Sequence, residues 1–481
     1  MKLTLINPPF LDKYSKSSRS PAVTKSGTIY FPLWLSYAAG VLDKEGHELQ
    51  LIDAPAKCYD KAQTVSKVLK FAPDLTVIDT STPSISSDLE FAKEIKKALP
   101  NSKICLVGTH ASACVEEILP DKSFVDFIAR HEYDYTLREL AAKLNEPDLY
   151  DGIDGISYVV GNKVINNRDR EYICNLDEVP FVSEVYKKYL DIKDYFYAHV
   201  SYPTISIFSS RGCPSKCFYC MYSQVMFGKG YRKRSARNLY DECVYITENF
   251  PEVKEILIDD DNFAVDQENV TEFCNLMIKN DVNLKWTVQV RVNLKYETMV
   301  LMKKAGCKLL VAGFESGNQQ ILNNMNKGIT LEQSLKFNAA AKKAKIRVHG
   351  CFMVGNPGET KETMIQTLNF AKKLKLDTTQ FFPLMLYPGT AAYEWAKNNN
   401  FIKAKDYSEW LKADGMHNCV LSTDTVTSKE LVDFCDYARK KFYLRPNYIF
   451  MKLKQCLTSK EDAVRTIKAF GTFRKYLFNN G

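Results

Sequence analysis

Three cysteines within eight residues form the stretch of this chain whose residue types are best suited to chemistry. Cys213, Cys217 and Cys220 stand at C-x3-C-x2-C spacing in the segment Arg211-Gly-Cys-Pro-Ser-Lys-Cys-Phe-Tyr-Cys220. Three thiolates on one short loop can bind three irons of a cubic iron–sulfur cluster, which normally takes four cysteines. The fourth iron then lacks a protein ligand, as in catalytic metal sites that keep one position open for substrate. The spacing therefore indicates redox chemistry at an open iron.

Two alternatives remain open for these cysteines. Cys217 and Cys220 have the spacing of a zinc knuckle, and His199 and Cys243 could complete four ligands, although neither lies at a typical zinc-site distance along the chain. The three cysteines could also be a coincidence, since the chain holds 14. Most of the 14 are scattered singly in apolar segments, which is typical of a protein from a reducing compartment.

Length and composition predict a soluble globular protein of two or three domains, because 45% of the 481 residues are apolar and 25% are charged. No apolar run reaches the roughly 18 residues that a membrane span needs. The N-terminus enters strand-like sequence at once, without the apolar core and cleavage site of a signal peptide. These features predict a cytoplasmic protein.

Residues 1–145 alternate between strand and helix patterns, which indicates a doubly wound parallel sheet of the flavodoxin or Rossmann kind. The expected strands are Lys2–Ile6, His47–Ile52, Leu75–Asp79, Lys103–Val107 and Phe124–Ala129, with helices at Phe31–Glu45 and Leu89–Leu99. In such sheets ligands bind beyond the carboxyl ends of the strands. The residues at those ends are Asn7, Pro8, Asp53, Ser81, Thr82, Gly108, Thr109, His110 and Arg130. No G-x-G-x-x-G follows the first strand, so a dinucleotide site has little support.

Residues 146–200 are predicted to be a connector that contains a hairpin turning at Gly161-Asn162. Residues 201–390 again alternate, which predicts a partial (β/α)6 barrel with its chemistry on loops at the carboxyl ends of the strands. The expected strands are Thr204–Ser209, Ile256–Asp259, Trp286–Val290, Leu309–Ala312, Arg347–Val354 and Thr379–Leu384. Polar residues follow them at Asp260, Asp261, Arg291, Glu315, Ser316 and Gly355–Glu359, and the cysteine loop follows the first strand.

The C-terminal region, residues 391–481, is predicted to be mostly helical and carries the basic charge of the protein. The net charge is +8, and Arg439–Gly481 alone holds 11 basic and 2 acidic residues. Its aromatic residues are Phe442, Tyr443, Tyr448, Phe450, Phe470, Phe473, Tyr476 and Phe478. A basic, aromatic helix can lie on an anionic membrane surface. Alternatively, the aromatic residues pack on the barrel and the lysines are solvated. No recognisable module supports a nucleic-acid partner.

The cysteine loop on a first barrel strand resembles the radical SAM superfamily, with S-adenosylmethionine (SAM) bound at the open iron of a [4Fe-4S] cluster. The resemblance implies that Cys213, Cys217 and Cys220 are the cluster ligands. It also implies roles in SAM binding: Phe218 or Tyr219 near the adenine, Arg291 at the carboxylate, Glu315 and Ser316 in a Gly-hydrophobic-Glu-Ser-Gly segment, and Gly355 and Glu359 in the strand and Pro-Gly-Glu-Thr turn that contact adenine. Two alternatives are that Arg291 and Glu315 form a structural ion pair and that Glu359 caps the next helix.

Residues 1–145 resemble the cobalamin-binding domain that precedes the barrel in cobalamin-dependent radical SAM enzymes. The resemblance rests on Asn7-Pro8-Pro9, Pro32-Leu33-Trp34, Asp53-Ala54-Pro55 and Val107-Gly108-Thr109-His110, with Arg130-His131-Glu132-Tyr133 in place of a Gly-Glu-x-Glu motif. It implies that the strand-end residues named above bind cobalamin. The Asp-x-His-x-x-Gly motif of such domains is absent, so no histidine from that motif would ligate the cobalt. A flavodoxin-like domain that binds nothing is the alternative.

The resemblance implies a radical enzyme in which a 5′-deoxyadenosyl radical abstracts hydrogen from an unactivated carbon, most simply for methyl transfer from methylcobalamin. The segments Ala129–Thr136 and Phe442–Pro446 also resemble the branch that acts on hopanoid lipids and forms rings. Ring formation or contraction on a lipid-like substrate is therefore an alternative, and a non-catalytic cobalamin- or SAM-binding protein is a second. The expected partners are a small-molecule or lipid-like substrate and an electron donor such as flavodoxin or ferredoxin, under anaerobic conditions.

Overall fold

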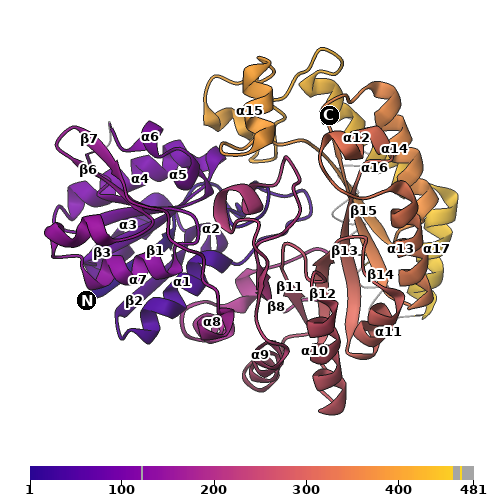
Figure 1. The fold of residues 1–481 in the computed structure, drawn as a ribbon, viewed down its shortest axis with the longest axis horizontal. Helices are drawn as coiled ribbons and strands as arrows, with labels where there is room; N and C mark the ends of the chain where they lie inside the picture. Colours follow the sequence, from indigo (N-terminus) through magenta and orange to yellow (C-terminus); the bar gives the residue numbers. More distant parts are fainter. Residues whose placement is uncertain (121–122, 459–465, 468–481) are drawn as a thin grey trace.

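A computed structural model describes residues 1–120, 123–458 and 466–467. Figure 1 shows the N-terminal sheet, in indigo and magenta, beside the strands of a second sheet that continues into the C-terminal helices. No helix in the described part of the chain is long and apolar enough to cross a membrane.

The N-terminal sheet has the order β2-β1-β3-β4-β5-β6-β7. Its first five strands are parallel: β1 (Lys2–Asn7), β2 (Glu48–Asp53), β3 (Leu75–Thr80), β4 (Lys103–Gly108) and β5 (Phe127–Ala129). This is the predicted doubly wound fold, and its topological switch point lies between β1 and β3. The predicted hairpin is also present, as β6 (Ile156–Val160) and β7 (Lys163–Asn166). Because β6 pairs with β5, the hairpin belongs to this sheet although it lies within residues 146–200.

Helices cover both faces of this sheet, as a parallel sheet with apolar strands requires. One core joins the strands to α1 (Leu33–Lys44) and α7 (Asp134–Ala142), and a second joins them to α3 (Lys61–Phe71) and α4 (Ile85–Ala98). Shorter helices follow the strand ends: α2 (Ala54–Lys57), α5 (Thr109–Ala113) and α6 (Val115–Ile118). After the hairpin, α8 (Val182–Tyr189) packs on α1 and leads toward the second domain.

The second sheet consists of six parallel strands in the order β15-β14-β13-β12-β11-β8. They are β8 (Thr204–Ile207), β11 (Glu255–Ile258), β12 (Lys285–Val290), β13 (Cys307–Glu315), β14 (Arg347–Val354) and β15 (Thr378–Pro383). The helices between them are α9 (Ala236–Asn249), α10 (Gln267–Lys279), α11 (Tyr296–Lys304), α12 (Gln319–Asn324), α13 (Leu331–Lys343) and α14 (Lys361–Leu374). The predicted partial βα barrel is therefore confirmed.

The helical C-terminal region closes one side of the barrel. Its helices are α15 (Ala391–Asn398), α16 (Ser428–Tyr443) and α17 (Pro446–Thr458). Helix α16 packs on β15, where the Tyr443 hydroxyl donates a 2.7 Å hydrogen bond to the carbonyl of Thr379. Tyr448 and Phe442 are buried beside it. These three aromatic residues therefore pack on the barrel. Phe470, Phe473, Tyr476 and Phe478 lie outside the described residues.

A buried ion cluster joins the two domains directly in front of the cysteine loop. Arg211, in the short strand β9 (Ser210–Arg211), places Nη1 2.8 Å from Glu132 Oε1 and 2.8 Å from Asp134 Oδ2. The side chain of Arg211 is completely buried, and its guanidinium lies 5.6 Å from the ring of Trp34. Burial by itself would lower the pKa of Arg211, but the carboxylates of Asp134 and Glu132 raise it above its usual value. Arg211 therefore stays charged and holds the start of the cysteine loop against the N-terminal domain.

Replacing Arg211 with Met should lower the free energy of unfolding by about 3–5 kcal/mol, because the buried carboxylate of Asp134 loses its cation and that of Glu132 loses one of two, the other being Arg232. Urea unfolding followed by tryptophan fluorescence measures this, since Trp34 lies beside the arginine. The matched control is Arg237→Met, because Arg237 is 69% exposed and pairs with Asp241 four residues along α9. Equal midpoints for the two variants would contradict a stabilising role for the ion cluster.

Candidate active site

The cysteine loop is a short irregular turn held by hydrogen bonds to its backbone. The side-chain amide of Gln224 donates from Nε2 to the carbonyls of Cys217, Phe218 and Cys220 at 3.2, 3.0 and 3.0 Å. The Phe218 amide donates to Met325 beyond α12, and none of the three cysteines forms a disulfide. Gly212 precedes the loop with φ +78°, and a Cβ there would lie 2.2 Å from the carbonyl oxygen of Gly230. The loop can therefore approach the neighbouring backbone only with glycine at this position.

The zinc alternative is wrong for the described part of the chain, because no three His, Cys, Asp or Glu side chains there converge on a single ion. Cys243 is fully buried in the core on α9, and His199 stacks on His349 at 5.7 Å. In a cubic cluster each thiolate binds its own iron, so the three sulfurs do not need to meet at one point. Within the described residues, Cys243 and His199 therefore do not complete a zinc site with the cysteine loop.

The cysteine loop lines a cavity of about 1900 Å³ in the barrel. Single small-molecule sites have volumes of about 300–1,000 Å³, so the cavity has room for more than one ligand. Its walls are the barrel interior, helix α16 and a segment of the N-terminal domain from Ser18 to Tyr30. Cys213, Cys217, Tyr219, Cys220, Arg291 and Glu315 are all on the wall. The structure thus brings these sequence-predicted residues together in one cavity.

Glu315 pairs with Lys327, a residue that the sequence analysis did not single out. Lys327 Nζ lies 2.7 Å from Glu315 Oε1 and 3.1 Å from the Tyr219 hydroxyl, which itself donates to Glu315 at 3.0 Å. Glu315 has φ +61°, at an irregularity where β13 pairs with β14. Both charged side chains are more than nine-tenths buried. No sequence pattern predicts that a glutamate will pair with a single lysine twelve residues later.

Arg291 lies beside the cysteine loop rather than beside Glu315. Its Nη1 is 3.4 Å from Cys217 Sγ, and its Nη2 donates to the backbone carbonyl of Lys327. The alternative of a structural ion pair between Arg291 and Glu315 is therefore wrong. The Met325–Gly328 turn contacts the cysteine loop, Arg291 and Glu315 together, so it couples the three predicted parts of the site.

Four other predicted SAM residues lie behind the cavity wall. Ser316 bonds to Thr367 of α14, Phe218 packs against Trp395 of α15, and Gly355 is covered by Leu431 of α16. Glu359 is buried and accepts a 2.5 Å hydrogen bond from the hydroxyl of Thr363. The cap of α14 is Thr360 itself, so Glu359 braces that turn from behind rather than capping the helix. In this structure these four residues support the site from outside the cavity.

The residues predicted at the ends of β1 and β2 are buried in the protein interior. The Asn7 amide donates to Asp53 Oδ1 at 2.8 Å, and the Tyr195 hydroxyl donates to Asp53 Oδ2 at 3.1 Å. Burial raises the pKa of Asp53 to about 7, although these hydrogen bonds oppose the rise. Pro8 is buried beside them.

The residues predicted after β3 and β4 also contact other side chains of the protein. Ser81 bonds to Tyr14 at 2.9 Å, and His110 bonds to Thr82 at 3.1 Å while Tyr407 packs edge-on against its ring. Burial lowers the pKa of His110 to about 3, so the ring is neutral. Gly108 has φ +101° where β4 approaches β3, and Thr109 is half-buried at the start of α5.

Arg130, after β5, braces the hairpin through an ion pair with Asp169 at 2.7 Å. None of the nine predicted strand-end residues is on the cavity wall.

Arg19 is a second residue that the sequence analysis missed. It reaches from the N-terminal domain to the carboxyl end of β11, with Nη1 2.5 Å from Asp259 Oδ1 and Nη2 2.8 Å from the carbonyl of Asp260. Asp260 accepts hydrogen bonds from Ser209 and Ser210, directly before the cysteine loop. Burial raises the pKa of Asp260 to about 6. The Asp259–Asp261 run therefore anchors the domain joint.

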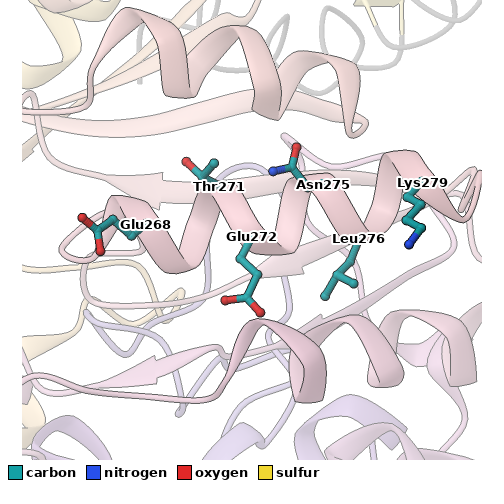
Figure 2. A pocket seen from close by; sticks show the side chains of 6 residues that line it. All are labelled: Glu268, Thr271, Glu272, Asn275, Leu276 and Lys279. Carbon is teal, nitrogen blue, oxygen red and sulfur yellow. The ribbon is translucent and has the colours of Figure 1, made fainter.

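A separate, shallow depression on the outer side of α10 is lined by six residues of that helix alone (Figure 2). Its lining contains no cysteine or histidine and shares no residue with the cavity at the cysteine loop.

Comparisons with known proteins agree with this arrangement. Residues 207–371 match the profile of the radical SAM superfamily, and residues 19–141 match that of the B12 binding domain. An uncharacterised methyltransferase of Pyrococcus horikoshii is 30% identical over 450 residues, covering 93% of this chain and 94% of that protein. An anaerobic magnesium-protoporphyrin IX monomethyl ester cyclase of Cereibacter sphaeroides is 24% identical, covering 86% of this chain and 67% of that protein.

Two solved structures share the fold. The methyltransferase TsrM of Kitasatospora setae, with cobalamin and a [4Fe-4S] cluster bound, matches with a TM-score of 0.70 at 16% identity over 93% of this chain and 89% of that one. The enzyme OxsB, with aqua-cobalamin and SAM bound, matches with a TM-score of 0.62 at 18% identity over 91% of this chain and 61% of that one. The fold and the site define a radical SAM enzyme. The chain belongs to the cobalamin-dependent radical SAM family, whose cofactors are a [4Fe-4S] cluster, SAM and cobalamin.

The residues on the cavity wall fit the cluster and SAM. Three thiols on one loop match three irons, and the neighbouring Arg291, Glu315 and Lys327 offer the mixed charges that an amino acid sulfonium requires. On the opposite wall the Ser18 hydroxyl is buried with no hydrogen-bond partner in the described part of the chain. A polar ligand between the two domains would satisfy that hydroxyl.

Replacing Lys327 with Met should weaken SAM binding by about tenfold or more, because the Glu315 carboxylate loses its buried partner and no longer holds one position. Calorimetric titration of reconstituted protein with SAM measures this, while iron content should not change. Lys327→Arg should restore part of the affinity. The control is Lys336→Met, on the exposed face of α13. SAM affinity equal to that of the control would contradict this role for Lys327.

Proposed function

We propose that this enzyme transfers a methyl group to an unactivated carbon of a small-molecule substrate. One observation supports the proposal above all. The cysteine loop, the Tyr219–Glu315–Lys327 cluster and the Ser18–Tyr30 segment of the N-terminal domain share one cavity with room for several ligands. When bound, the cluster supplies the electron that cleaves SAM to a 5′-deoxyadenosyl radical, and methylcobalamin supplies the methyl group.

In this proposal the side chains place the reactants and take no part as acid or base. Cys213, Cys217 and Cys220 hold the cluster away from bulk water, since the first two are less than 8% exposed. Arg291 and Glu315 hold the charged end of SAM, with Lys327 fixing the carboxylate. Arg19 binds Asp259 at the carboxyl end of β11 and holds the N-terminal domain against the barrel opening, where Ser18 lines the cavity. This contact keeps the reacting groups together.

The assay is anaerobic reconstitution followed by reduction in the presence of SAM. Wild-type protein should form 5′-deoxyadenosine and S-adenosylhomocysteine, whereas Cys217→Ala should lose both products and the visible iron–sulfur absorption while remaining folded. Cys174→Ala, at an exposed cysteine, is the control. Absence of 5′-deoxyadenosine from the wild type would contradict a radical enzyme. Deoxyadenosine without S-adenosylhomocysteine would favour ring formation over methyl transfer.

Two partners follow as further proposals. A one-electron donor such as flavodoxin or ferredoxin would reduce the cluster. A peripheral membrane contact would use Phe450 and Leu457, which are 72% and 88% exposed and lie two turns apart on one side of α17. The basic residues of the same region would add attraction to anionic lipid.

Replacing both Phe450 and Leu457 with Ser should at least halve sedimentation of the protein with anionic vesicles, because the apolar contact of α17 is lost. Ile365→Ser, at an exposed apolar residue of α14, is the control. Equal sedimentation of the double variant and the control would exclude α17 as a membrane contact.

A further inference from the structure

The loop that follows β5 in the N-terminal domain contacts the cysteine loop at both of its ends. Before the first cysteine, Glu132 and Asp134 bind the guanidinium of Arg211. Beyond the third cysteine, His131 Nδ1 lies 2.6 Å from the backbone carbonyl oxygen of Val225. A carbonyl only accepts hydrogen bonds, so Nδ1 carries the hydrogen of this contact. One loop of the N-terminal domain therefore holds the beginning and the end of the cysteine loop.

Val225 belongs to a single π-turn, Tyr222–Met226, that starts just beyond the cysteine loop. The turn closes with a 2.8 Å hydrogen bond from the Phe227 amide to the first carbonyl of the turn. Carbonyls in the last turn of a helix have no partner within the helix, so the carbonyl of Val225 can accept a donor from elsewhere. The imidazole of His131 supplies that donor from the N-terminal domain.

Gln224, in the same turn, transmits this restraint to the cysteine loop. Its Nε2 contacts three carbonyls of that loop, and its Oε1 accepts a 2.9 Å hydrogen bond from the amide of Ala391 at the start of α15. Without the Nε2 donor, the three carbonyl dipoles would face one another and repel. The conformation of the cysteine loop therefore depends on where Gln224 is placed, and the contact of its neighbour Val225 with His131 fixes that place.

His131 is itself held in an uncommon conformation. Its φ is +60°, which is uncommon outside glycine and persists where surrounding contacts enforce it. The His131 amide donates to Ser112 Oγ of α5 at 2.9 Å. Its other ring nitrogen, Nε2, lies 3.4 Å from Oδ1 of Asp169, whose side chain is 67% exposed. The shorter contact with Val225 is therefore the one that places the imidazole.

We propose that His131 and Gln224 are positioning residues for the [4Fe-4S] cluster, which fix the end of the cysteine loop as Arg211 fixes its beginning. The proposal concerns the cluster that this family requires and does not depend on methyl transfer. Residues that orient metal ligands without touching the metal typically contribute about 10–100-fold to metal affinity. Cluster retention and the electronic signature of the cluster therefore report on both side chains.

The first test is the rate at which the anaerobically reconstituted holoprotein loses iron to a ferrous chelator, followed by absorbance. Gln224→Met keeps the size of the side chain but has no amide donor. This variant should lose iron about tenfold faster than the wild type and change the electron paramagnetic resonance spectrum of the reduced cluster. Gln320→Met is the matched control, because Gln320 is exposed and bonds to Asn324 within α12. A rate and a spectrum equal to those of this control would overturn the role of Gln224.

A second variant separates the two contacts of Gln224. Gln224→Glu keeps an acceptor for the Ala391 amide but turns a carboxylate oxygen toward the three carbonyls. It should therefore lose iron at least as fast as Gln224→Met. Iron retention equal to that of the wild type would show that the contact with α15 is the one that matters, and the proposal would fail. Circular dichroism of each holoprotein checks that the fold is intact.

Variants of His131 separate its donor from its backbone conformation. His131→Asn should retain the cluster, because asparagine tolerates a positive φ and can donate from Nδ2. His131→Gly also tolerates this φ but has no side-chain donor, so it should lose iron about tenfold faster than the wild type. The matched control is His47→Gly, before β2 at the opposite end of the sheet.

Equal rates for His131→Gly and His47→Gly would overturn the role of His131, as would equal rates for the Asn and Gly variants of His131. No step of these tests requires turnover, so a failed methyl-transfer assay would leave the proposal standing.

Discussion

The buried contact of Arg211 with Glu132 and Asp134 is the interaction on which the site depends. A guanidinium with no exposed surface would be strongly unfavourable alone, and two carboxylates of the N-terminal domain make it stable. Because Arg211 stands two residues before Cys213, the same contact sets where the cysteine loop begins. The relative position of the two domains and the position of the cluster ligands are therefore determined together.

Other charged residues at the domain joint also pair with opposite charges across it. Arg19 from the N-terminal domain satisfies the carboxyl end of β11, and Lys25 meets Asp436 on α16. Each pair ties the Ser18–Tyr30 segment to a different wall of the barrel. This segment thereby closes the cavity of about 1900 Å³ and contributes the buried Ser18 hydroxyl to it. A partial barrel needs such a cover, because its six strands do not close on themselves.

Much of the architecture could be predicted from the chain. Alternating patterns located all six barrel strands and the five parallel strands of the first domain, because buried parallel strands are short apolar runs separated by helices. The spacing of the cysteines likewise identified a candidate cluster loop. At the strand ends of the first domain, Tyr14, Tyr195 and Tyr407 contact Ser81, Asp53 and His110, and the role of these three residues in cobalamin binding stays a prediction. These tyrosines come from distant segments that no local pattern connects to the strands.

The sequence by itself determined the two α/β domains, the order of their strands along the chain and the cysteine loop, since each depends on neighbouring residues. Only the tertiary structure decided which charges face one another. Glu315 pairs with Lys327 instead of Arg291, and Asp436 meets Lys25 from the other end of the chain. An ion pair depends on a distance of a few ångströms in space. Separation along the sequence does not constrain that distance, so these partners emerge only when the chain is folded.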